Sequence, residues 1–140
     1  MPPQPIRYDS QFLDLTKRFQ VYTTVDASPA AAAETVIATI NLTGFADTAV
    51  LSGVLLNCWA AYTVGTSGTA VTFRIRQTNV SGTVVVTTGA LTKTAASLYA
   101  DDVNGFDAGA GVGAYAFTMQ VTSGAAASTV SALLIQATII

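Results

Sequence analysis

The chain contains no histidine, a single cysteine (Cys58) and few charged residues, which fill only 10% of its 140 positions. Without an imidazole it cannot build a Ser-His-Asp triad, a Cys-His dyad or a histidine metal site. One cysteine excludes an intrachain disulfide and a thiolate zinc cluster. These absences remove the common enzyme signatures. We therefore expect no enzymatic activity, no catalytic residues and no cofactor, and a function that depends on surfaces.

Long hydrophobic runs and clustered cations are also missing. Hydrophobic residues reach 51%, but threonine and serine interrupt them, and no stretch approaches the roughly 20 apolar residues of a membrane-spanning helix. The N-terminus, beginning Met1-Pro2-Pro3, lacks the layout of a signal peptide. The net charge of -2 argues against a phosphate-binding groove, which needs clustered lysine and arginine. We expect a soluble chain with neither nucleic acid nor membrane as a partner.

The first 17 residues differ from the remainder. Pro2, Pro3 and Pro5 favour an extended backbone and remove hydrogen-bond donors. The residues that follow mix apolar and charged side chains without a clear period. We predict an extended N-terminal arm over residues 1–17 and one domain over residues 18–140. The alternative is an edge strand or short helix that packs on its own domain.

From Arg18 onward, apolar and polar residues alternate with the period of a β-strand. The alternation predicts eight strands near residues 19–25, 36–42, 49–63, 71–77, 83–88, 91–99, 115–122 and 129–139. The segment Asn79-Val80-Ser81-Gly82 predicts a hairpin turn, and residues 101–113, rich in glycine, predict a long loop. Short strands separated by regular turns indicate an all-β fold. The predicted fold is a single antiparallel eight-stranded β-sandwich that is jelly-roll-like.

The predicted loop holds the chain's only acidic cluster, which starts at Asp101. Oxygen-rich loops can bind calcium, and Asp102, Asn104 and Asp107 are the candidate ligands. Their spacing does not match the helix-loop-helix calcium motif, and loops also use these residues simply because they tolerate turns. Paired carboxylates can hydrolyse glycosides, but no pattern here places them in a cleft.

Two further features follow from the strand pattern. Arg74 and Arg76 share the outward face of one strand, which is either a solvated surface or a face that recognises an anionic partner. Cys58 and Trp59 lie in a strand that is apolar on both sides, so both side chains are expected in the core.

The last charged residue is Asp107, so the final 33 positions carry no charge. Exposed strands normally carry some charge, which prevents edge-to-edge pairing. We therefore expect other subunits to cover this region, with Leu133, Ile135 and Ile139 as candidate interface residues.

Four stretches together resemble the jelly-roll decoration, or cement, proteins of tailed bacteriophage capsids. They are FQVYTT (19–24), AVTFRIRQ (70–77), AYAFTMQV (114–121) and STVSA (128–132). The similarity covers residues 18–140 and lies in texture and architecture: alternating strands rich in alanine, threonine and valine, few charges, and an arm in front.

The resemblance implies a homotrimer on the outer capsid surface of a virion assembled in the host cytoplasm. It implies that each trimer bridges neighbouring copies of the major capsid protein and stabilises the shell against the pressure of packaged DNA. The arm would supply the capsid contacts through Ile6, Arg7, Tyr8, Phe12, Leu13 and Leu15. The alternative function is a receptor- or glycan-binding domain of a virion or a carbohydrate-binding module, for which Tyr99, Phe106 and Tyr115 are the candidate aromatic residues.

Overall fold

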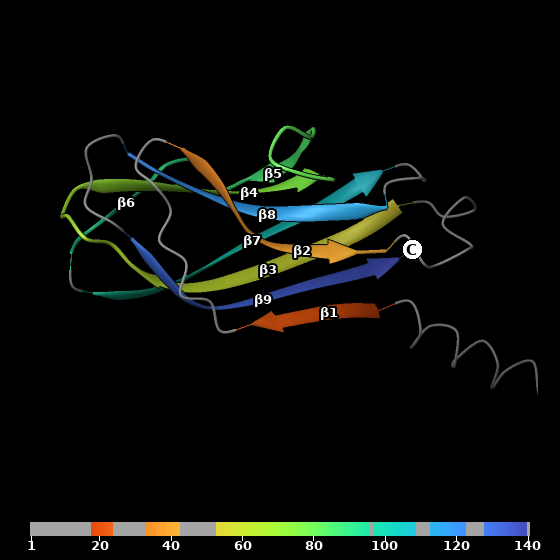
Figure 1. The fold of residues 1–140 in the computed structure, drawn as a ribbon, viewed down its shortest axis with the longest axis horizontal. Coiled ribbons are helices and arrows are strands. Elements are labelled where there is room, and N and C mark those ends of the chain that lie inside the picture. The colour runs from red at the N-terminus through yellow and green to blue at the C-terminus, as the bar shows by residue number, and fades with distance from the viewer. Residues whose placement is uncertain are drawn as a thin grey trace, which may run out of the picture.

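The computed structural model describes residues 18–23, 33–42, 53–95, 97–108, 113–122 and 128–139, which form two packed β-sheets (Figure 1). The strands are β1 (Arg18–Thr23), β2 (Glu34–Asn41), β3 (Gly53–Thr63), β4 (Thr69–Gln77), β5 (Val84–Thr87), β6 (Leu91–Lys93), β7 (Leu98–Ala108), β8 (Ala114–Val121) and β9 (Thr129–Ile139). No helix long and apolar enough to cross a membrane occurs in the described segments. The predicted arm, residues 1–17, lies outside them.

The strands divide into sheet A, with the order β1-β9-β3-β7, and sheet B, with the order β2-β8-β4-β5. Every pairing is antiparallel. Strand β6 also pairs with β4, at residues 69–71, whereas β5 pairs with β4 at residues 74–76. Because β5 and β6 follow one another along the same strand, they occupy a single strand position. The sandwich therefore has eight positions, four in each sheet.

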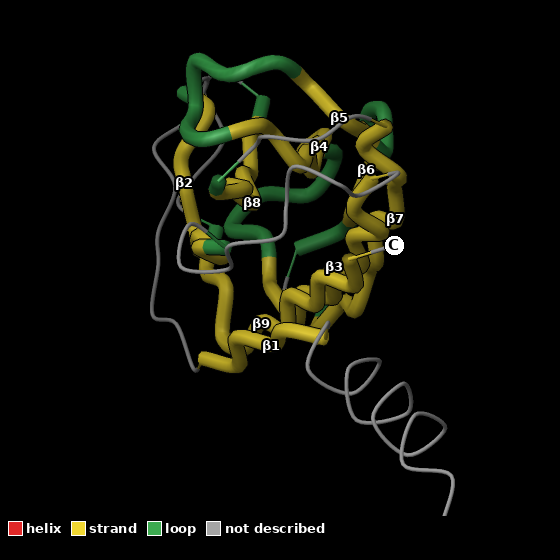
Figure 2. Tube along the Cα trace, turned by 90° about the vertical axis from the view of Figure 1, so that its right-hand side faces the viewer, coloured by secondary structure: helices red, strands yellow, loops and turns green. Residues whose placement is uncertain are grey.

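The connections define a jelly roll. Apart from the step between β4 and β5 and the short step to β6, each connection crosses from one sheet to the other. Figure 2 looks along the strands and shows the two layers, with β1, β9, β3 and β7 in one and β2, β8 and β4 in the other. Two four-stranded sheets wound in this way are the jelly-roll arrangement. The predicted all-β, eight-stranded, jelly-roll-like sandwich is confirmed.

Alternation along the strands produces the core between the sheets. In β4, Val71, Phe73 and Ile75 are at most 1% exposed, and the residues between them face outward. Phe73 stacks on Phe117 of β8 at 5.3 Å between ring centroids and meets Tyr62 of β3 edge-on at 5.1 Å. These rings join the two layers at the centre of the sandwich.

The turn between β4 and β5 has the predicted hairpin position. The amides of Ser81 and Gly82 donate to the side chain and backbone oxygens of Asn79, both at 2.9 Å. A Cβ atom on Gly82 would lie 1.6 Å from the carbonyl oxygen of Gln77, so only glycine fits this close approach.

The prediction of a loop over residues 101–113 is wrong for its first part, because β7 continues to Ala108. Aspartate, asparagine and glycine disfavour strands in isolation. Here β7 pairs with β3 along its whole length, and its inward residues gain partners inside the sandwich. Tertiary contacts therefore override the local preference.

Candidate functional site

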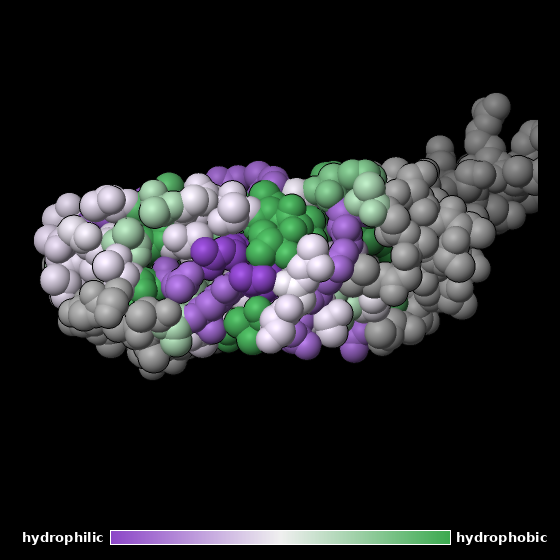
Figure 3. All heavy atoms as spheres, turned by 90° about the horizontal axis from the view of Figure 1, so that it is seen from above, coloured by the Kyte–Doolittle hydropathy of each residue, from purple (hydrophilic) through white to green (hydrophobic). Residues whose placement is uncertain are grey.

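The two outer faces of the sandwich differ in charge, and the charged one belongs to sheet B. Glu34 begins β2, and its carboxylate accepts two hydrogen bonds from Arg76 of β4, from Nε at 2.6 Å and from Nη2 at 2.8 Å. Thr118 of β8 donates to the same carboxylate at 2.6 Å. Arg74 lies 3.3 Å from Glu34 and donates to Gln120 at 2.8 Å. In Figure 3 hydrophilic residues form a band across this face between hydrophobic groups.

The geometry of this cluster sets its electrostatics. The hydrogen bond from Arg76 lowers the pKa of Glu34, and the Thr118 hydroxyl and the positive charge of Arg74 add to that effect against the opposing influence of burial. The hydrogen bond to Glu34 in turn raises the pKa of Arg76. One carboxylate faces two guanidinium groups, so the cluster carries a net charge of +1. This is a two-point, charge-assisted contact that fixes three strands.

The structure therefore places Arg74 and Arg76 together on an outward face, as the alternation predicts. Sequence reasoning missed Glu34, which already binds both of them. The available signal was that Glu34 is the chain's only glutamate and stands two residues before the predicted strand 36–42. Recognition of an anionic partner by these arginines stays a prediction.

The acidic residues of β7 point to both sides of sheet A. Asp101 faces inward, where it accepts a hydrogen bond from the Tyr62 hydroxyl and lies 2.9 Å from Lys93 Nζ. Asp107 also faces inward and accepts from the Tyr115 hydroxyl at 2.7 Å and from Gln77 at 3.0 Å. Each aspartate thus satisfies a buried tyrosine near one end of the sandwich.

Burial is the main reason that the pKa values of Tyr62 and Tyr115 rise, and their aspartate acceptors raise them further. Burial also acts on Asp101, but the hydrogen bonds from Tyr62 and Lys93 outweigh it and lower the pKa of that carboxyl. At neutral pH both tyrosines are therefore neutral donors, and the two aspartates are their acceptors.

The three calcium candidates are not brought together. Asp102 and Asn104 lie on the outer side of β7, where the Asn104 amide donates to the Asp102 carboxylate at 2.7 Å, whereas Asp107 lies on the inner side. Among the described residues, no three histidine, cysteine, aspartate or glutamate side chains form a group that could hold a metal. The strand, in place of the expected loop, separates these oxygens.

The candidate interface residues Leu133, Ile135 and Ile139 lie in the core, with exposed fractions of 1%, 0% and 6%. This corrects their predicted role, because a neighbouring subunit cannot reach side chains between the two sheets. Strand β9 is apolar on both sides, so its sequence does not show which side faces outward. The outward residues of this part of β9 include Leu134, Gln136 and Thr138.

Cys58 is buried, as predicted, and burial raises the pKa of its thiol. Trp59 is not in the core, contrary to the prediction, because it faces outward from β3 and is 40% exposed. Trp59 therefore belongs to the outer surface of sheet A. We use "the outer face of sheet A" for the outward residues of β3, β7 and β9.

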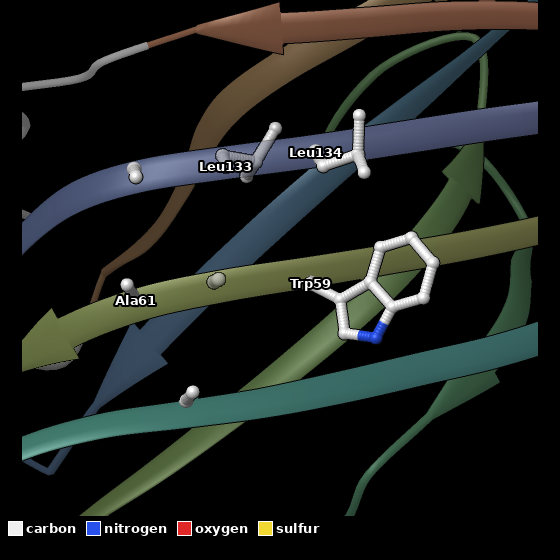
Figure 4. Close-up of a pocket in the computed structure, with 7 residues that line it drawn as sticks. Trp59, Ala61, Leu133 and Leu134 are labelled. Atoms are coloured by element: carbon white, nitrogen blue, oxygen red, sulfur yellow. The ribbon is translucent and has the colours of Figure 1, made fainter.

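The outer face of sheet A contains an apolar hollow of about 170 Å³. Figure 4 shows Trp59 and Leu134 on neighbouring strands, with Ala61 further along β3. The hollow is lined by Trp59, Ala60, Ala61, Ala100, Ala132, Leu133 and Leu134. The lining contains no charged side chain, so the hollow can bind an apolar group but offers no acid, base or nucleophile.

The aromatic residues proposed for glycan binding do not share a surface. Tyr115 is fully buried, Phe106 is exposed on the outer face of sheet A, and the Tyr99 ring lies under Lys93 Nζ at 4.7 Å. The Tyr99 hydroxyl exchanges hydrogen bonds with the backbone of Thr94. The exposed aromatic residue that sequence reasoning missed is Trp59.

No protein-family model matches the chain. No curated protein is similar to it in sequence. Solved structures do share its fold. A chain of the infectious bursal disease virus Gx strain superposes with a TM-score of 0.61 at 12% identity, over 86% of this chain and 32% of that one. A chain of the T=1 particles derived from infectious bursal virus superposes with a TM-score of 0.64 at 8% identity, over 87% of this chain and 31% of that one.

A non-viral structure also matches. Dimeric latent PorU from Porphyromonas gingivalis gives a TM-score of 0.58 at 11% identity, over 88% of this chain and 13% of that one. The chain spans about a third of the virus chains that it matches and a smaller part of PorU. At these identities the likeness defines the fold alone, a jelly-roll sandwich of the kind that occurs in virus particles.

Proposed function

We propose that this chain is a structural protein of a virus particle that decorates the capsid and catalyses no reaction. The observation that carries the proposal is the fold, because the jelly roll superposes on chains of virus particles over most of its length. The internal contacts support it. Four acidic residues are described: Glu34, Asp101 and Asp107 are bound by arginine, lysine, glutamine or tyrosine, and Asp102 by the amide of Asn104, so no two of these carboxylates form a free pair.

In its finer form, the proposal is a homotrimeric cement protein of a tailed bacteriophage. The trimer binds the outer capsid surface, bridges major capsid proteins and adds contacts that must break before packaged DNA ruptures the shell. Three linked arms would raise the avidity of binding by roughly 10²- to 10⁴-fold over a single arm. The residues assigned to these contacts are those predicted for the arm: Ile6, Arg7, Tyr8, Phe12, Leu13 and Leu15.

The test is a comparison of particles made with and without the gene that encodes this chain. Quantitative mass spectrometry of purified virions is expected to find the chain in multiples of three per capsomer junction. Particles that lack it are expected to release DNA at a lower temperature. Absence of the chain from virions made with the gene would refute the structural role, and equal heat resistance of the two kinds of particle would refute the stabilising role alone.

A further inference from the structure

The outer face of sheet A is far less charged than the outer face of sheet B. Asp102 is the only charged side chain among the described outward residues of β3, β7 and β9. Seven large hydrophobic side chains are exposed in the described part of the chain, and four of them lie on this face. They are Leu55 at 46%, Trp59 at 40%, Leu98 at 70% and Phe106 at 48%. Concentrated apolar exposure of this kind marks a contact surface.

The strand register arranges these residues in rows across the sheet. Leu55 pairs with Phe106, and two positions further along β3 Asn57 pairs with Asn104 and Gln136. The next row contains Trp59. The row after it is Ala132-Ala61-Ala100. A row of small residues therefore lies directly beside the row that carries the indole.

This arrangement is self-complementary. The alanine row lines the 170 Å³ hollow together with Trp59 and Leu134. One face thus offers both a projection and a recess. A two-fold contact between identical subunits needs this combination, because the same surface must supply both partners.

The amide row indicates the same partner. Asparagine and glutamine side chains carry donors and acceptors together, so the same amide row on a second copy can pair with this one. A strongly charged partner has only Asp102 to recognise on this surface.

The area of the face also fits a second copy. Strands β3, β7 and β9 each contain 11 residues. At about 3.3 Å per residue and about 4.8 Å between strands, three strands of this length present roughly 520 Å² in projection, and the relief of the side chains adds to that figure. Specific protein interfaces bury about 600–1,000 Å² of accessible surface on each partner. A second sheet can cover the whole face, whereas a short oligosaccharide covers only a few rows.

We propose that copies of this chain associate through the outer face of sheet A, with Trp59 of one copy covered by the same face of another. The inference goes beyond the proposed function: a contact in which the same face of each copy meets is two-fold, so it joins copies in pairs and is separate from the threefold contacts of the proposed trimer. It also replaces the core residues Leu133, Ile135 and Ile139 as the candidate interface.

The test uses the full-length protein and its single tryptophan as a reporter. Sedimentation across a dilution series measures association, and the emission maximum and acrylamide quenching of Trp59 measure its exposure. We expect association to be accompanied by a blue shift and by protection from quenching. Leu55→Asp and Ala100→Arg place a charge on the face and keep the tryptophan, so each is expected to weaken association by about tenfold or more.

The matched control is Val36→Asp on the outer face of sheet B. The exposed fraction of Val36 is 39%, which is similar to the 46% of Leu55 and the 40% of Trp59. It is expected to associate as the unmodified protein does. A chain that stays monomeric, or that associates while Trp59 remains as quenchable as in the monomer, would overturn the inference. Equal effects of Val36→Asp and Leu55→Asp would overturn it as well.

Two other occupants give distinct results, and either one overturns the inference. If the arm covers the face, Phe12→Asp with Leu13→Asp will expose Trp59 in a protein that is monomeric throughout. If the face binds a polysaccharide, soluble glycans will shift the emission of monomeric protein. Capsid binding is measured separately: a monomer that binds capsids refutes only this inference, and an associating protein absent from virions refutes only the proposed function.

Discussion

Arg76 and Glu34 form a two-point ion pair between strands that are not neighbours in their sheet, with distances of 2.6 and 2.8 Å. Strand β8 lies between them and contributes Thr118, whose hydroxyl donates to the same carboxylate. The side chains are 14% and 18% exposed, so water screens the pair only partly. This single carboxylate therefore links β2, β8 and β4.

Replacing Glu34 with glutamine should destabilise the sandwich. Arg76 would lose its charged acceptor while remaining largely buried, and lost hydrogen bonds to charged groups cost about 1–3 kcal/mol. Urea denaturation followed by circular dichroism measures the change. The control is Asp102→Asn, whose hydrogen-bond partner is the exposed Asn104, and it should change the free energy of unfolding by less than about 0.5 kcal/mol. Equal losses in both variants would contradict the role of the cluster.

Acid should destabilise the protein by protonating the carboxylates of Glu34 and Asp101. The pKa values of Glu34 and Asp101 are lowered in the folded state, so their contribution is fully present above their unfolded pKa values of about 4 and is lost as pH falls through the folded values. Stability should thus decline below about pH 4. In Glu34→Gln the decline should be shallower, as measured by melting temperature from pH 7 down to pH 2. A slope identical to that of the unmodified chain would argue against Glu34 as a source of the decline.

Alkaline pH should act through the buried tyrosines. The pKa values of Tyr62 and Tyr115 are raised in the folded state, so their contribution is complete below the unfolded pKa of about 10 and is lost as pH rises above it. Melting temperatures between pH 8 and pH 12 should fall steeply above about pH 10. Tyr115→Phe removes one titrating group and leaves Gln77 bound to Asp107, so the melting temperature of this variant should fall less steeply with pH. If the fall in melting temperature at high pH were unchanged in both Tyr62→Phe and Tyr115→Phe, the two tyrosines would not be its cause.

Cys58 should be inert in the folded protein. The side chain is fully buried, and burial raises the pKa of the thiol, so little thiolate is available to react. A chromogenic disulfide reagent should label less than one thiol per chain until denaturant is added, and then one. Rapid labelling without denaturant, at a rate independent of stability, would show that the thiol is reachable from solvent.

The predicted arm can be tested without shortening the chain. Phe12→Asp with Leu13→Asp should preserve the melting temperature, because every described strand begins at Arg18 or later. Binding to capsids that lack the chain should weaken by about tenfold or more, because buried apolar anchors dominate such contacts. Co-sedimentation measures the binding, with Gln11→Ala as the control in the same segment. Full decoration by the double variant would exclude a role for these two residues.

The strand pattern predicted most of the fold because alternation is visible wherever one side of a strand is polar. In β4 the sequence separates Phe73 from Arg74 clearly, and both lie on the predicted sides. In β3 and β9 both sides are apolar, so nothing local distinguishes Trp59, which is exposed, from Leu133, which is buried. The Glu34–Arg76 pair depends on the register of three strands, and β7 depends on pairing with β3. These relationships arise only in the folded chain.

The break between β5 and β6 limits how the protein can grow into larger assemblies. A long free strand edge is a template on which another chain can add a strand without limit. The edge of sheet B beyond β4 consists of a four-residue strand and a three-residue strand, so neither offers an incoming strand more than a few hydrogen bonds. Open-ended fibre growth is therefore disfavoured along this edge, which favours closed assemblies over fibres.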